Sequence, residues 1–213
     1  MKRLFMTNYQ DNDTLRIEAF SDGVFAIDIT LLTLDLKPPI LKNEFTITAL
    51  ARAMGAQWPS YLAFFISFAT IYVVWVNHHR MYNVIRKSDK RFLFINGALL
   101  ILVTLIPYTT GVLAKFINTE AMEFSCAIYL ILFALISMVF RFMWQHAARN
   151  FQLLKRPSMD VRVKVVEKSH LIATTIYTLA AGLAFLNPYV SLGIGLLTVS
   201  YIANIQYEKE PSI

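Results

Sequence analysis

Ionisable and nucleophilic side chains gather at two places in an otherwise apolar sequence. Ser21, Asp22 and Asp28 occur within eight residues of one another, and His78 and His79 stand at the end of a long apolar run. Carboxyl and imidazole groups at close range can relay protons, and Ser21 is the one candidate nucleophile beside them. Two adjacent histidines point about 100° apart on a helix, so a metal site at this pair is not expected.

The sequence around these residues argues against enzymatic chemistry. No Gly-x-Ser-x-Gly element, nucleotide-binding loop or metal-ligand spacing accompanies Ser21, Asp22 and His78. The single Cys126 excludes a disulfide framework and zinc sites built from paired cysteines. We therefore expect neither an enzyme nor a bound cofactor or metal.

The composition is typical of a membrane protein. Of the 213 residues, 56% are hydrophobic and only 16% are charged, against about 25% charged in soluble domains. A transmembrane helix needs about 20 mainly apolar residues. Four runs lack Asp, Glu, Lys and Arg: 27 residues from Ala53 to His79, 23 from Phe92 to Ala114, 17 from Phe124 to Phe140, and 37 from Leu171 to Tyr207. The last run is long enough for two spans with a turn at Asn187-Pro188, so these runs predict five spans.

A sixth span contains the carboxyl groups. Residues 15–36 include Asp22, Asp28 and Asp35, although Asp22 and Asp35 are also compatible with the two membrane interfaces. An ionisable residue inside a span usually faces protein or water, so we expect this span to line a pathway. The sequence predicts an all-α polytopic membrane protein, with one domain over residues 1–213 and short helices within 37–57 and around 157–167. The six spans are expected at about 15–36, 58–80, 92–114, 122–143, 168–186 and 188–207.

Basic residues predict the orientation of these spans. Sixteen of the 20 Lys and Arg residues fall on the side that holds both termini, which is therefore predicted to be cytoplasmic. The basic N-terminal segment precedes no cleavable apolar stretch, so no signal peptide is expected. The net charge of +6 is attributed to this topology and to contact with anionic lipid rather than to nucleic-acid binding.

The same topology brings the two polar clusters to one depth. Trp75, His78 and His79 end the second span, where Ser21 and Asp22 open the first, so a hydrogen-bonded network between the two spans is expected. Further along the first span, Ile27, Leu31 and Leu34 form an apolar stripe at helical spacing, with Thr30 beside it. Such a stripe is a packing face or, when repeated around an axis, a hydrophobic constriction.

The pattern Arg16-x-x-x-Phe20-Ser21-Asp22, followed by an apolar span and then by Trp75 and His78-His79, resembles the transmembrane protein 175 family of potassium channels in its prokaryotic six-span form. The resemblance implies a homotetramer in the bacterial inner membrane that conducts K⁺ passively. It implies a pore lined by the first helix, without a Thr-Val-Gly-Tyr-Gly filter. The constriction would lie at Ile27 and continue through Leu31 and Leu34, and Thr30 would form a hydroxyl ring. A helix-packing role is implied for Arg16, Phe20, Ser21, Asp22, Trp75 and one histidine of the pair His78 and His79.

Asp28 departs from the small or apolar residue expected at its position. It lies about 100° from Ile27 around the helix, so it is expected to face a neighbouring helix rather than the pore axis. A second function therefore stays open, namely a proton-coupled secondary transporter that uses Asp22, Asp28 and the His78-His79 pair. The expected partners are membrane lipid, monovalent cations and further copies of the chain.

Overall fold

The apolar runs fold into long helices, and three of the described helices begin at a side chain that caps them. The computed structural model describes residues 14–41, 45–149, 153–154 and 163–207. Its helices are α1 (Leu15–Leu31, continued by a 3-10 turn at Leu32–Asp35), α2 (Ile47–Ala56), α3 (Trp58–Val84), α4 (Lys90–Thr104), α5 (Ile106–Phe116), α6 (Met122–Arg149), α7 (Val163–Leu183) and α8 (Pro188–Ala203). The side chains of Thr46, Asp89 and Asn187 accept backbone N–H groups in the first turns of α2, α4 and α8.

Helices occupy the segments of the sequence that were predicted as spans, with one interruption. The span predicted at 92–114 is divided into α4 and α5 at Leu105. Pro107 explains the division, because it has no N–H to donate to the carbonyl of Val103 one turn earlier. Helix α2 lies within the loop where a short helix was expected. The other expected short helix, around 157–167, falls largely outside the described residues, which resume at Val163.

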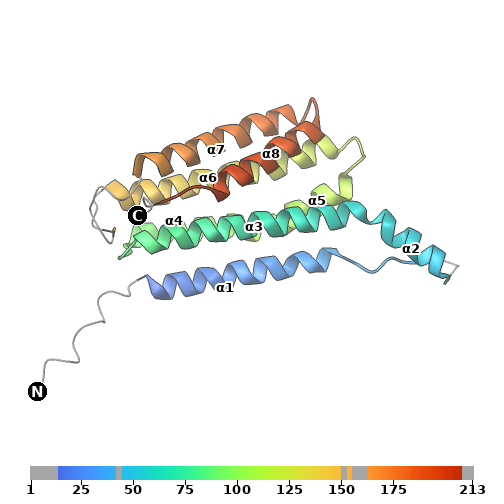
Figure 1. Ribbon diagram of the computed structural model, residues 1–213, viewed down its shortest axis with the longest axis horizontal. Coiled ribbons are helices and arrows are strands. Elements are labelled where there is room, and N and C mark those ends of the chain that lie inside the picture. The colour runs from blue at the N-terminus through green and yellow to red at the C-terminus, as the bar shows by residue number, and fades with distance from the viewer. Residues whose placement is uncertain (1–13, 42–44, 150–152, 155–162, 208–213) are drawn as a thin grey trace, which may run out of the picture.

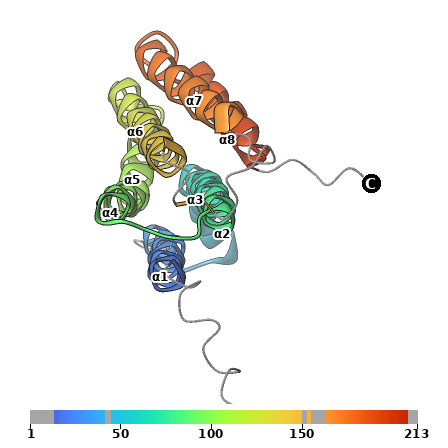
Figure 2. The ribbon, with the colours of Figure 1, turned by 90° about the vertical axis from the view of Figure 1, so that its left-hand side faces the viewer.

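The helices run roughly antiparallel in a layered bundle (Figure 1). Helix α6 is central: it packs against α7 and α8 on one side and against α4 and α5 on the other. Helix α1 lies at the edge of the bundle away from α7, as the view along the helices shows (Figure 2), and it packs against α3, α4 and α5. One side of α1 is therefore left uncovered by its own chain.

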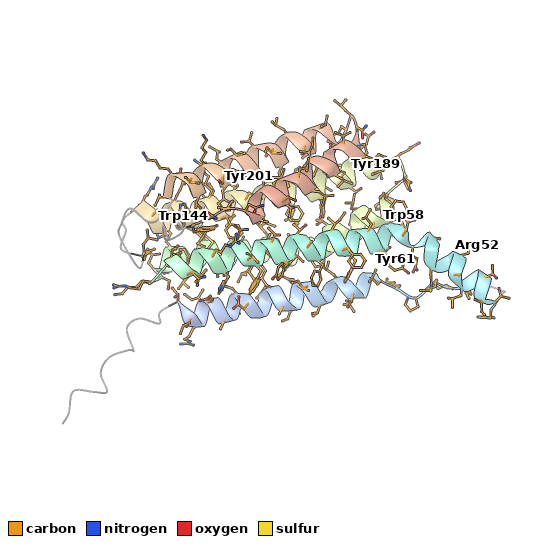
Figure 3. The ribbon with its side chains drawn as sticks, viewed as in Figure 1. Arg52, Trp58, Tyr61, Trp144, Tyr189 and Tyr201 are labelled. Carbon is orange, nitrogen blue, oxygen red and sulfur yellow. The ribbon has the colours of Figure 1, made fainter. Side chains whose placement is uncertain are left out.

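Three helical stretches among the described residues are long and apolar enough to cross a membrane: α3, the combined α4 and α5, and α6. Helix α8 is equally apolar but shorter. Trp58 and Tyr189 are exposed aromatic residues that each carry a polar group on the ring. Both lie near the end of the bundle from which α2 projects (Figure 3). Such residues are enriched at membrane–water interfaces, so they indicate one boundary of the apolar layer.

Candidate functional site

Helix α1 presents two different faces. Its buried side chains, Ser21, Phe25 and Asp28, recur at spacings of four and three residues, and Leu32 continues the same line into the 3-10 turn. This face packs into the seam between α3 and α4. Because successive residues are about 100° apart on a helix, Ala26, Ile27 and Thr30 lie on the other, exposed side of α1.

The stripe predicted from the sequence lies on the uncovered side. Ile27 is 59% exposed, Leu31 41% and Leu34 66%, although all three are large apolar residues in a protein rich in buried ones. Thr30 is also exposed, and its hydroxyl donates to the carbonyl of Ile27 at 2.7 Å. The lone pairs of that hydroxyl oxygen are left available to a cation.

Asp22 and Trp75 join the start of α1 to the last turns of α3. The indole Nε1–H of Trp75 donates to Asp22 Oδ1 at 2.8 Å. The ring of Trp75 is stacked on His79, with centroids 5.8 Å apart, and His79 Nδ1 lies 3.1 Å from Glu18 Oε1. Three side-chain contacts thus follow one another along the seam between α1 and α3.

A second set of contacts is fully buried and includes α4. The Asn96 amide donates from Nδ2 to Ser21 Oγ at 3.0 Å, and its Oδ1 lies 3.0 Å from His78 Nε2. Since an amide oxygen only accepts, His78 carries its proton on Nε2 in this arrangement. The His78 ring also contacts Phe25 on α1, with centroids 5.3 Å apart. Asn96 therefore bridges α1 and α3 from a third helix.

Two residues of the sequence motif stand outside these contacts. Phe20 is 66% exposed, and Arg16 is exposed and makes no hydrogen bond or ion pair within the part of the chain that the structure describes. Both lie on the uncovered side of α1. In this subunit, therefore, Ser21 and Asp22 are the motif residues that join α1 to other helices.

Sequence reasoning missed two members of the network, Asn96 and Glu18. Asn96 left a signal that could have revealed it, because a polar amide inside the 23-residue uncharged run must find partners once buried. Glu18 lies one helical turn before Asp22, so it shares the face that meets α3. The two histidines make their side-chain hydrogen bonds to these two residues rather than to Asp22.

Asp28 is buried, in agreement with the expectation that it faces a neighbouring helix. It is 1% exposed, and its Oδ2 has no hydrogen-bond partner among the described residues. Asp22, Asp28 and the two histidines do not form a continuous hydrogen-bonded chain in the described part of the protein.

A further polar contact lies at the same end of the bundle, in the loop between α3 and α4. Asp89 caps α4 by accepting the N–H of Phe92 at 2.7 Å, and its other oxygen lies 2.8 Å from His146 Nε2 on α6. The Phe92 N–H, and then His146, hold the pKa of the Asp89 carboxyl below its usual range. This residue thus ties the start of α4 to the end of α6.

The long apolar helices and their exposed apolar surfaces are those of an integral membrane protein. A family model described as the endosomal/lysosomal potassium channel TMEM175 matches residues 16–107, which include α1, the network and Pro107. The chain belongs to the TMEM175 family, as the motif predicted, and this is a family of ion channels rather than enzymes.

Relatives support this assignment over nearly the whole chain. A potassium channel of Chamaesiphon minutus is 39% identical over 194 residues, which cover 91% of this chain and 95% of the relative. A potassium channel of Streptomyces collinus is 35% identical, covering 89% of this chain and 92% of the relative. The crystal structure of a lysosomal potassium-selective channel TMEM175 homolog from Chamaesiphon minutus superposes with a TM-score of 0.79 at 36% identity, covering 91% of this chain and all of that one.

Proposed function

We propose that the protein is a K⁺ channel that conducts passively across the bacterial inner membrane. The names of the Chamaesiphon and Streptomyces relatives support the choice of ion. The route is the one that the family resemblance implies: four copies assemble around one axis, and α1 of each copy lines the pore. No bound cofactor is required, since K⁺ in the pore is the transported ion.

The observation that carries the proposal is the apolar stripe on the uncovered side of α1. Ile27, Leu31 and Leu34 are exposed although the opposite side of the same helix is buried and held by hydrogen bonds. In a tetramer with closed symmetry, four such stripes face one axis. They form a hydrophobic constriction in place of a carbonyl filter, and a constriction of this kind can gate by loss of water.

Thr30 supplies the polar element of this wall. Its hydroxyl proton is engaged by the Ile27 carbonyl, so its oxygen can accept a cation that has lost part of its hydration shell. Asp22 and Trp75 do not touch the ion in this proposal. They hold α1 at a fixed depth and rotation, so that the stripe points to the axis.

The membrane topology proposed with this pore has six spans in a single domain of residues 1–213. Each of the six segments crosses once: α1, α3, the combined α4 and α5, α6, α7 and α8. The excess of Lys and Arg on one side supports cytoplasmic termini. Basic side chains on that side also suit contact with anionic lipid.

Flux from purified protein in liposomes tests the function. We expect K⁺ to pass down its gradient faster than Na⁺ and without dependence on a proton gradient. Protein-free liposomes, as the control, should show no K⁺ flux. The particle mass should correspond to four chains of 24.4 kDa. Saturable flux that requires a proton gradient would instead support the transporter, and a monomer would contradict the shared pore.

A further inference from the structure

We propose that each subunit holds an ordered water molecule in a small cavity between α3, α6, α7 and α8. The water would bridge Asn77 Oδ1 on α3 and His170 Nδ1 on α7. This site lies on the side of α3 turned away from α1. It is separate from the proposed pore, and its test needs no ion flux.

Two buried atoms without partners point to the site. Asn77 is fully buried, and both N–H bonds of its amide are used, one on the carbonyl of Val73 and one on that of Ile202 in α8. Its Oδ1 has no partner among the described residues. An amide oxygen that is buried without a hydrogen bond is destabilising, so the structure favours a donor at this position.

His170 presents the second atom. Its ring is 1% exposed and stacked on Phe140, with an interplanar angle of 2°. Nε2 lies 3.1 Å from the hydroxyl of Tyr207, whereas Nδ1 has no partner in the described part of the chain. A water can accept from Nδ1–H or donate to unprotonated Nδ1, so either tautomer of this histidine is compatible with the bridge.

Both residues line one cavity, which has room for a water. Its volume is about 20 Å³, above the roughly 10–15 Å³ that one water molecule needs. Thr70 and Ser137 also line it, and both are buried. Ser137 Oγ can donate or accept, and Thr70 Oγ1, which already donates to the carbonyl of Ile66, can still accept, which fits the two to four hydrogen bonds that a buried water usually makes.

A neighbouring cavity differs in the hydrogen-bond partners of the polar residues that line it. That cavity is larger, about 50 Å³, and is lined mostly by apolar side chains of α3, α5, α6 and α8. Its polar residues are satisfied by protein: Ser67 pairs with Thr110, and Thr110 and Thr70 each bond a helix carbonyl. Among the described residues, no buried side-chain atom that lacks a hydrogen-bond partner belongs to a residue lining this larger cavity. The two cavities therefore differ in their unpartnered polar atoms, and a water gains most where it supplies such atoms with a partner.

Magnetisation transfer from water, measured by solid-state NMR on protein with ¹⁵N-labelled histidine in bilayers, tests the proposal. The chain has four histidines, and His170→Gln identifies the signal of that residue. His78 is the matched control, because it is also buried with an unpartnered Nδ1 but does not line the cavity. We expect a water cross-peak at His170 and none at His78.

A variant that fills the cavity sharpens the test. Ser137→Val adds methyl groups to the wall, and we expect the His170 cross-peak to be lost while the protein stays assembled. Absence of the peak in the wild-type protein, with the half-exposed His79 as positive control, would overturn the proposal. Equal peaks at His78 and His170 would also overturn it, since they would show general penetration of water. The comparison of His78 with His170 stands even if Ser137→Val does not fold.

Discussion

Trp75 and Asp22 stand 53 residues apart in the sequence, and a hydrogen bond of 2.8 Å joins the indole N–H of one to the carboxyl of the other. The bond connects the first turns of α1 to the last turns of α3. It ties α1 to α3, while the hydrogen bond between Asn96 and Ser21 ties α1 to α4. The orientation of the apolar stripe thus depends on polar contacts on the opposite side of the same helix.

Replacing Trp75 with Phe should lower the free energy of unfolding by about 1–3 kcal/mol. The substitution removes the N–H donor but keeps a ring against His79, so the loss reports mainly on the hydrogen bond. Thermal unfolding of the purified protein measures it. Asp22→Asn, which keeps an acceptor oxygen, should cost less than Asp22→Ala. An unchanged unfolding temperature in Trp75→Phe would contradict the account.

Asn96→Leu should be more destabilising than Ser21→Ala. Leucine has a similar volume, but it leaves both Ser21 and His78 without their buried partner, at about 1–3 kcal/mol for each group. Ser21→Ala leaves only one N–H group of the Asn96 amide without an acceptor. Ile101→Ala on the exposed side of α4 serves as control and should stay within about 0.5 kcal/mol of wild type. The reverse order of the two effects would show that Asn96 is not the bridge.

Asp28→Asn should leave the protein at least as stable as the wild type, with an expected gain of about 1 kcal/mol. The amide keeps the shape of the side chain and removes the cost of burying a carboxyl whose Oδ2 lacks a partner. Thermal unfolding of the assembled protein is again the measurement. A clear loss of stability would mean that the carboxyl has a partner in the assembly that a single subunit does not supply.

Acid should weaken the contact of Asp89 with α4 and α6. Its pKa is lower in the folded protein than in the unfolded chain, so its stabilisation is present above the ordinary aspartate pKa of about 4. That stabilisation is lost as the pH falls through the lower, folded-state pKa. Asp89→Asn keeps a capping side chain but does not titrate, so the stability of the variant should fall less than that of the wild type between about pH 5 and 2. Parallel curves for both proteins would contradict this assignment.

Much of the fold could be predicted because charge and hydropathy follow the membrane closely. The uncharged runs locate α3, α6 and the combined α4 and α5, since crossing an apolar layer allows few other solutions. The meeting of Trp75 with the start of α1 followed from two adjacent antiparallel spans. The family was also predictable from the short motif that includes Ser21 and Asp22, and the comparisons confirm it.

The rest depended on side-chain partners that spacing alone does not identify. Asn96 and Glu18 complete the network, but only the packing of α4 and α3 against α1 reveals which groups they meet. The break at Leu105 was overlooked although Pro107 was a visible signal. The pore-lining role of Ile27 depends on neighbouring copies, so it is a proposal that only an experiment on the assembled protein can test.

Access of a charged thiol reagent to Ile27→Cys tests the central claim most directly. The native Cys126 is buried and can be replaced by Ser, which gives a background without reactive thiols. Leu197→Cys is the control, because Leu197 is 73% exposed on α8, away from the proposed axis. If α1 lines the pore, a water-soluble cationic reagent should block K⁺ flux through Ile27→Cys in liposomes and leave Leu197→Cys unaffected. Unchanged flux through an Ile27→Cys protein that mass measurement shows to be fully modified would contradict the claim.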